Sequence, residues 1–263
     1  MIGELYFEGS IFDLLLNGKQ EVFDMDFDLN NINALPGNQI LVKNTILRLY
    51  DQNLQLVKKI ESLNGLSFAS LGFELNLEEK KFYIPDVQHH RIIMTDFEFN
   101  FIKVFGSLGN SNDQLKYPFD LCLANNNLYV LDSGNNRIQI FLTNLEFVKS
   151  WELDYWLYQI KALNMTLFVQ SNEEIYLYNL NDLSLIQKYG NGFCQISKMN
   201  SNIYGFNFQA QKLFCYDDKA NCEEITYANK YLQSKTDGSL VELNGAIYMS
   251  SRSNRKILRF TKN

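Results

Sequence analysis

The chain has 263 residues, and 46% of them are hydrophobic, which is enough to bury one substantial core. No linker rich in Pro, Gly or Ser divides the sequence, so we expect a single domain that spans residues 1–263. The net charge of −6 opposes nucleic-acid binding, which draws its affinity from clustered Lys and Arg. No apolar run reaches the roughly 18 residues that a membrane helix needs, so we expect no membrane insertion.

The N-terminal part of the chain alternates between apolar and polar residues with a period of two, which predicts β-strands. Residues 21–27 show this alternation, and residues 5–7 and 11–16 form two further strand-like runs. The segment 40–50 then predicts a hairpin with a short turn. Residues 54–60 predict one more strand after that hairpin.

The same hairpin pattern recurs along the whole chain as an apolar run, a turn-rich segment and a second apolar run. Its further copies occupy residues 82–94, 128–141, 167–178, 203–216 and 247–260. Outer strands are predicted after these copies at residues 101–105, 147–153, 183–189 and 223–227, and inner strands before them at residues 119–124, 160–163 and 240–243. Four strands that repeat at roughly 36 to 46 residues are typical of propeller blades.

These repeats predict an all-β fold, a six-bladed β-propeller of four-stranded antiparallel blades. The chain ends at Asn263, directly after the third-strand pattern of the last blade, so the fourth strand must come from elsewhere. Residues 21–27 can supply it, which would close the ring with an N-terminal strand and remove an exposed edge. The runs at 5–7 and 11–16 leave an alternative with seven blades, one of them incomplete.

The segment from Tyr117 to Phe141 resembles an NHL repeat, whose pattern runs from a Pro-containing strand through a Tyr-Val-Asp-Ser-Gly-Asn-Arg-Ile hairpin to an aromatic residue. The resemblance implies that Asp132 and Arg137 are the structural pair of the repeat, which fixes the hairpin and the contact between blades. Asp86 and Arg91 occupy the same offsets in the preceding copy. The later copies carry weaker pairs at these offsets, namely Asn207 with Lys212 and Ser251 with Lys256.

The turn of this hairpin contains residues that suit a tight reversal of the chain. Gly134 can adopt a positive φ without steric cost, and Asn135 or Asn136 tolerates the left-handed region. Together with Asp86, Arg91, Asp132 and Arg137, these two residues, Gly134 and Asn135, form the predicted structural motif of the repeat.

A catalytic function requires a reaction centre, and the sequence offers weak candidates for one. The only histidines, His89 and His90, are adjacent, so they would diverge on a strand or lie at the rim of a turn. A calcium-dependent lactonase or esterase would need oxygen ligands at the ends of the inner strands, and the candidates are Asp120, Glu173, Glu174, Asn207 and Glu242. Such residues are common in turns, so we expect no cofactor, no metal site and no enzyme.

Four cysteines, Cys122, Cys194, Cys215 and Cys222, show no paired spacing of the metal-binding kind. Cys215 and Cys222 flank a predicted turn and leave a disulfide conceivable, although Cys122 and Cys215 fall within strands and read as buried small hydrophobes. With no signal peptide visible at the N-terminus, a reducing compartment is favoured, and we expect a cytoplasmic protein.

Aromatic residues make up 14% of the chain, and most should fill the space between blades. One group, Trp151, Tyr155, Trp156 and Tyr158, lies in a connection between two predicted blades and should emerge at a face of the ring. Trp and Tyr are enriched in binding hot spots, so we expect this group to bind a protein partner, while capping of the groove between blades remains the alternative.

The sequence thus favours a non-catalytic protein-interaction scaffold that is a subunit or adaptor of a larger assembly. The resemblance to NHL propellers also implies RNA binding as an alternative, and a C-terminal basic group offers a candidate surface, which comprises Arg252, Arg255, Lys256, Arg259 and Lys262. Alternation places Arg255 and Arg259 on one side of a strand and Lys256 on the other, which favours a solvated edge over a binding groove.

Overall fold

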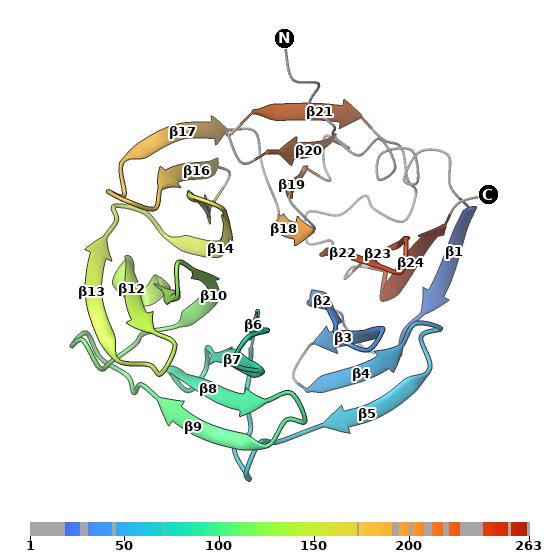
Figure 1. Cartoon of the computed structure of the whole chain (residues 1–263), viewed down its shortest axis with the longest axis horizontal. Coiled ribbons are helices and arrows are strands. Elements are labelled where there is room, and N and C mark those ends of the chain that lie inside the picture. Colours follow the sequence, from blue (N-terminus) through green and yellow to red (C-terminus); the bar gives the residue numbers. More distant parts are fainter. Residues whose placement is uncertain are drawn as a thin grey trace.

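The computed structural model describes residues 19–26, 31–43, 46–70, 72–172, 174–190, 195–199, 202–207, 212–217, 221–226, 239–251 and 254–261. Within these ranges the strands form six sheets of four antiparallel strands each, arranged as blades around a central channel (Figure 1). The prediction of an all-β six-bladed propeller is confirmed. The helical content of this part of the chain is the short 3-10 turn η1 (Ser133–Asn135), and no described helix is long and apolar enough to cross a membrane.

Each blade begins with an inner strand at the channel and ends with an outer strand at the rim (Figure 1). Blade 1 comprises β2 (Asn31–Leu35), β3 (Gln39–Lys43), β4 (Leu47–Asp51) and β5 (Leu56–Ile60). Blade 2 comprises β6 (Glu74–Asn76), β7 (Lys81–Asp86), β8 (Arg91–Asp96) and β9 (Phe101–Phe105). Blade 3 comprises β10 (Pro118–Ala124), β11 (Asn127–Asp132), β12 (Arg137–Leu142) and β13 (Phe147–Glu152).

The second half of the ring repeats this order. Blade 4 comprises β14 (Leu157–Leu163), β15 (Thr166–Ser171), β16 (Glu174–Asn179) and β17 (Leu185–Gly190). Blade 5 comprises β18 (Gln195–Met199), β19 (Asn202–Asn207), β20 (Lys212–Tyr216) and β21 (Cys222–Thr226). Blade 6 comprises β22 (Leu240–Leu243), β23 (Ala246–Ser251), β24 (Lys256–Thr261) and the N-terminal strand β1 (Lys19–Asp24).

The two ends of the chain meet in blade 6, where β1 pairs with β24 in an antiparallel register from Lys19 opposite Thr261 to Asp24 opposite Lys256. The predicted closing strand is therefore confirmed, although it covers 19–24 rather than 21–27. Two ion pairs support the seam, Lys256 with Asp24 and Arg259 with Glu21. The runs at 5–7 and 11–16, on which the seven-blade alternative depended, lie outside the described residues.

This seam also changes the interpretation of the C-terminal basic group. Lys256 and Arg259 each face a carboxylate of β1, so their charges are largely balanced within the blade. Arg252 and Lys262 lie outside the described residues. Lys256 and Arg259 therefore form a paired edge of the sheet, whereas Arg255 lies exposed in the turn before β24.

The apolar core is divided into clusters that fill the grooves between neighbouring blades. Leu41 and Leu49 of blade 1 pack against Phe82 and Ile93 of blade 2, and equivalent clusters join blade 2 to 3, 3 to 4, 4 to 5, and 6 to 1. A single four-stranded sheet of this size exposes two faces, so each blade is stable only when its neighbours cover both of them.

Tyrosines of the second strands reinforce these grooves with polar contacts. The Tyr83 hydroxyl donates to the carbonyl oxygen of Thr143 in blade 3, with 2.8 Å between the oxygens. The Tyr248 hydroxyl donates in the same way to the carbonyl oxygen of Gln52, across the junction between blades 6 and 1, again at 2.8 Å. Each ring is buried while its hydroxyl finds a partner, as large amphipathic side chains require.

Asp132 anchors the hairpin of blade 3 from a fully buried position. Its carboxylate accepts hydrogen bonds from Arg137 Nε at 2.7 Å, from Asn135 Nδ2 at 2.9 Å and from the backbone nitrogen of Lys116 at 2.6 Å. Arg137 Nη2 in turn donates to the carbonyl oxygen of Ser111 at 2.9 Å. The aspartate and the arginine thus tie the hairpin to the segment that enters the blade.

Blade 2 repeats this arrangement with Asp86 and Arg91. Asp86 accepts hydrogen bonds from Arg91 Nε at 2.8 Å and from the backbone nitrogen of Ala69 at 3.0 Å. Arg91 Nη2 reaches the carbonyl oxygen of Ser67 at 2.9 Å. The two pairs therefore occupy equivalent places in successive blades.

Gly134 has a different role from the one expected of it. The residue with positive φ in this turn is Asn136, at 51°, whereas Gly134 lies inside η1 and has no positive φ. Its backbone instead approaches the entering segment closely, because a Cβ there would lie 2.8 Å from the carbonyl oxygen of Lys116 and 2.6 Å from that residue's Cγ. A side chain at this position would push the two segments apart.

We predict that Asp132→Ala destabilises the protein by about 3–5 kcal/mol, because it leaves the buried guanidinium of Arg137 without its carboxylate. Urea unfolding measures this change as a lower midpoint. Asp182→Ala is the matched control, since the carboxylate of Asp182 caps only an exposed turn at Ser184. Equal midpoints for the two variants would contradict the anchoring role of Asp132.

Candidate functional site

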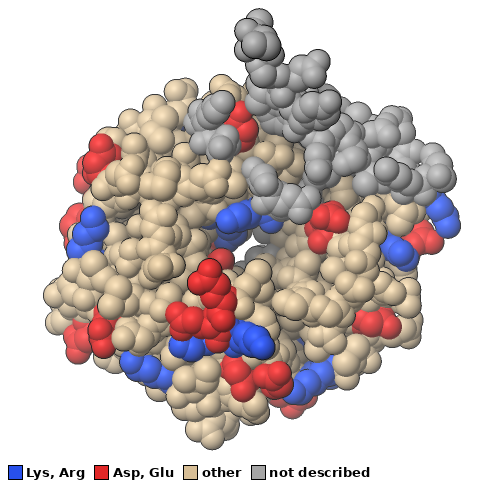
Figure 2. Space-filling view, in the orientation of Figure 1, with Lys and Arg blue, Asp and Glu red and all other residues tan. Residues whose placement is uncertain are grey.

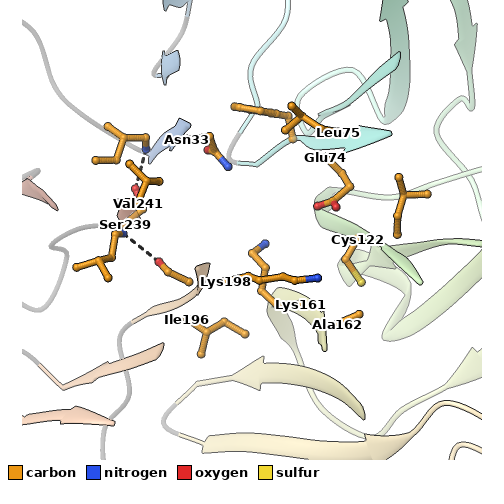
Figure 3. Close-up of a pocket in the computed structure, with 15 residues that line it drawn as sticks. Asn33, Glu74, Leu75, Cys122, Lys161, Ala162, Ile196, Lys198, Ser239 and Val241 are labelled. Carbon is orange, nitrogen blue, oxygen red and sulfur yellow. Dashed lines mark hydrogen bonds between the residues drawn. The ribbon is translucent and has the colours of Figure 1, made fainter. Parts of the chain in front are cut away.

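The inner strands of all six blades surround the central channel, and each contributes to its lining one residue from an equivalent position of the strand. Each of these residues stands opposite a large or apolar residue of the second strand, such as Glu74 opposite Tyr83 and Cys122 opposite Tyr129. The six residues of this channel ring are Asn33, Glu74, Cys122, Lys161, Ser197 and Val241. They line a cavity of about 160 Å³ (Figure 3).

Three charged side chains point into the middle of this cavity, Glu74, Lys161 and Lys198 (Figure 3). The space-filling view shows basic side chains at the edge of the central opening (Figure 2). Lys161 Nζ forms an ion pair with Asp120 Oδ2 at 2.7 Å. Among the described residues, no salt bridge within 4.0 Å joins Glu74 or Lys198 to an oppositely charged group.

Asp120 occupies a tight position between blades 2, 3 and 4. Its Oδ2 accepts hydrogen bonds from Lys161 Nζ and from the backbone nitrogen of Ile160 at 3.0 Å. Its Oδ1 lies against Gly72, where a Cβ would come within 2.1 Å of that oxygen. Gly72 therefore leaves the space that the carboxylate fills, and Asp120 is held in place from three sides.

The cavity environment shifts the protonation of the groups that line it. Burial raises the pKa of Glu74 from 4.5 to about 7, although Lys161 and Lys198 oppose the shift. Burial alone would lower the pKa of Lys161, but the carboxylates of Asp120 and Glu74 outweigh it and raise that pKa. Burial, and then the charge of Glu74, raises the pKa of the Cys122 thiol, so this cysteine stays protonated.

The wall of the channel is held together by hydrogen bonds from one inner strand to the next. At four junctions a side chain of one blade accepts a hydrogen bond from an edge amide of the following blade, at distances of 2.6 to 3.1 Å. The acceptors are Asp120, Gln159, Ser197 and Ser239, and the donors are the backbone nitrogens of Ile160, Ile196, Leu240 and Ile32. These contacts satisfy amides at strand edges that would otherwise lack partners beside the channel.

The candidate calcium ligands from the sequence do not converge. Asp120 is paired with Lys161, Glu174 lies at the start of β16 in an ion pair with Lys188, and Glu242 accepts from the backbone nitrogen of Gly245. Asn207 is buried at the end of β19, and Glu173 lies outside the described residues. Across the described ranges no group of three or more His, Cys, Asp or Glu residues is placed to hold a metal ion.

The histidines lie in the hairpin turn of blade 2, between β7 and β8. His89 Nδ1 is 2.8 Å from Asp86 Oδ2, and the His90 ring meets the Tyr117 ring edge to face with centroids 4.7 Å apart. The two imidazoles thus contact the hairpin and the segment that enters blade 3, and neither lines the central cavity.

The described cysteines form no disulfide with one another, and Cys194 lies outside the described residues. Cys215 stands opposite Glu223, and Cys222 stands opposite Tyr216, across β20 and β21. Since neighbouring residues of a strand point to opposite faces, the two side chains lie on different faces of blade 5. The conceivable disulfide between them is therefore not present.

The predicted aromatic group divides into two parts. Trp151 packs edge to face against Tyr178 with centroids 4.6 Å apart, and Tyr155 stacks on Tyr176 at 4.3 Å. Both rings are half-buried in the groove between blades 3 and 4. Trp151 and Tyr155 therefore cap the groove between the blades, the alternative that the sequence left open, and rings of β16 pack against them.

Trp156 and Tyr158 remain at the surface, with 36% and 39% of their areas exposed. Both contact Phe119, with ring centroids 5.9 and 6.0 Å away. Tyr117, two residues before Phe119 in the chain, is 42% exposed. We call these four residues, Tyr117, Phe119, Trp156 and Tyr158, the aromatic track; they lie where the inner strands of blades 3 and 4 begin.

Sequence reasoning missed Glu74, Lys161, Lys198, Tyr117 and Phe119 as candidate site residues. The first three belong to short inner strands whose residue types differ from blade to blade, so no repeated residue identified them. Their charge could have identified them, because a charged residue in an innermost strand must face either the channel or a neighbouring blade.

Comparison with known proteins supports the fold that the sequence predicted. The model of the NHL repeat matches residues 115–141, which include β10, β11 and all of β12 except its last residue, Leu142. Together with the six blades, this match fits an NHL-repeat propeller and confirms the resemblance found in the sequence. A search of curated protein sequences gives no match.

Solved structures resemble the chain over nearly its whole length. They include virginiamycin B lyase from Staphylococcus aureus, with a TM-score of 0.65, 11% identity and coverage of 93% of this chain and 99% of the lyase. A streptogramin B lyase gives 0.63 and 13%, with 93% and 98% of the two chains covered. The Cps50 (Swd1) β-propeller domain of Myceliophteria thermophila gives 0.60 and 8%, with 92% and 100% covered. Such low identities show the fold alone.

We predict that Glu74→Gln changes how stability depends on pH. The folded state holds the Glu74 proton more tightly than the unfolded chain, so the stability that this proton contributes is present below pH 4.5 and is lost as the pH rises through about 7. The variant should equal the parent at about pH 4 and exceed it by about 3 kcal/mol at about pH 8.

Urea unfolding at the two pH values measures this difference, with Glu78→Gln, an exposed change in the adjoining turn, as the matched control. A constant difference between Glu74→Gln and the parent across this pH range would show that Glu74 does not titrate as its environment indicates.

Proposed function

We propose that this protein is a non-catalytic scaffold that binds a protein partner through the face that carries the aromatic track. The observation that carries the proposal is a group of aromatic side chains over two blades, in which the exposed Trp156 and Tyr158 both contact the half-buried Phe119 and the exposed Tyr117 lies two residues before Phe119. Tyr and Trp supply large contact areas with few rotatable bonds, and they are over-represented among residues that dominate binding energy.

The surroundings of the track suit a rigid contact surface. Beneath it, Leu157 and Leu121 are fully buried, and Ser133 Oγ donates to the carbonyl oxygen of Leu157 at 2.7 Å. The strand beginnings that hold the track are therefore fixed before a partner binds, which lowers the ordering cost of association. The net charge of the chain is −6, which repels the phosphate backbone of a nucleic acid and therefore favours a protein as the partner.

An enzyme that works in the channel is the second candidate function. It is favoured by Glu74, whose pKa of about 7 suits a general acid or base at neutral pH, beside the ammonium groups of Lys161 and Lys198. A calcium-dependent hydrolase is less well supported than an enzyme that uses Glu74, because its candidate ligands are dispersed over several blades or already paired.

We predict that the double substitution Trp156→Ala and Tyr158→Ala weakens partner binding at least about tenfold, because hot-spot residues contribute about 2 kcal/mol or more each. The partner is captured from the native source with the parent protein and identified by mass spectrometry, and its affinity is then measured with purified proteins.

Ile186→Ala is the matched control, since it removes an exposed apolar side chain from the outer strand β17 of blade 4. The proposal requires that this variant binds like the parent and that both variants keep the parent's melting temperature. Equal affinity for the parent and the double variant would remove the aromatic track as the contact surface.

A further inference from the structure

The channel holds a lysine, Lys198, that forms no direct ion pair with a carboxylate among the residues that the structure describes. Lys198 extends into the cavity from β18, toward the region that Glu74 and Lys161 also reach (Figure 3). Lys161 is neutralised by Asp120 at 2.7 Å, but the described residues include no carboxylate within ion-pair distance of Lys198. The ammonium group of Lys198 is therefore available to an anion that enters the channel.

The net charge of the cluster depends on Glu74. Lys161 and Asp120 cancel each other, which leaves Lys198 and Glu74 as the groups that set the charge of the cavity. When Glu74 is ionised the cluster is neutral, and when Glu74 is protonated the cluster carries one positive charge. A single negative charge on a ligand complements the second state, in which the Glu74 carboxyl can also donate a hydrogen bond.

The walls add a second requirement for the ligand. Apolar side chains from all six blades line the same cavity as the charged groups, among them Phe73, Leu75, Ile196 and Val241. Its volume of about 160 Å³ is comparable with that of a cavity that admits a benzene-sized molecule. The site therefore suits a ligand with one charged end and a short apolar end. An inorganic anion would leave the apolar walls of the cavity without a contact.

We propose that the central channel binds a small monocarboxylate, whose carboxylate lies between Lys198 and Glu74 and whose short apolar tail contacts the channel wall. This site shares no residue with the aromatic track, so tests of the two proposals are independent of each other.

Binding at this site should be coupled to a proton. The charged and titratable groups that face Glu74 are Lys161, Lys198, Asp120 and Cys122, and burial raises the pKa of Glu74 itself to about 7. Above its pKa of about 7, Glu74 must take up a proton before a carboxylate can approach it. The affinity should therefore fall about tenfold between about pH 6 and pH 8.

The test is a calorimetric titration of the full chain with butyrate at about pH 6 and pH 8, with n-butylammonium and inorganic phosphate as comparison probes. Butyrate should bind, and n-butylammonium should not, because it meets the Lys198 ammonium. Lys198→Met keeps the length of an exposed side chain while removing its charge, and it should weaken butyrate binding about tenfold or more. Glu74→Gln should keep the affinity of the parent at about pH 6 and lose the pH dependence.

Several outcomes would overturn the assignment. These are undetectable butyrate binding at about pH 6, equal affinity of the parent and Lys198→Met, or binding of n-butylammonium as tight as that of butyrate. Phosphate binding without butyrate binding would show an inorganic anion site and exclude the carboxylate. The melting temperatures of both variants, measured without ligand, establish that each protein is folded during the titration.

Discussion

The structure depends on the stacking of each thin sheet between two neighbours, and this stacking requires a closed ring. A four-stranded blade cannot cover both of its apolar faces by itself, so its stability comes from the grooves on either side. The pairing of β1 with β24 completes the last blade with a strand from the other end of the chain. Separation of these two strands would uncover β24 and weaken the contacts of blades 1 and 6 together.

The ring also determines what meets at its centre. Because each inner strand presents one side chain at the same height, residues that are far apart in the chain, such as Asn33, Glu74 and Lys161, line one cavity. Blade stacking thus creates the channel site without any local sequence motif for it. The same geometry places the beginnings of β10 and β14 side by side, which brings Phe119 within ring contact of Trp156 and Tyr158.

This difference explains what could be predicted from the sequence. The hairpins repeat locally, and the pairs Asp86 with Arg91 and Asp132 with Arg137 are separated by five residues, so alternation and turn residues were enough to indicate the blades. The burial of Trp151 and Tyr155 depends on Tyr176 and Tyr178 in the next blade, which no local pattern connects to them. Glu74, Lys161 and Lys198 were missed for the same reason, since their environment is formed by other blades.

The channel charges are informative because the fold does not need them. Cys122, Ser197 and Val241 occupy equivalent ring positions with small or uncharged side chains, so a stable inner wall can be built without ionisable groups. Burial of Glu74 and Lys161 costs desolvation free energy, and the ion pair with Asp120 offsets that cost for Lys161 alone. Charges that lower stability in a scaffold able to omit them are a physical argument for a binding site, and this argument supports the proposed site in the channel.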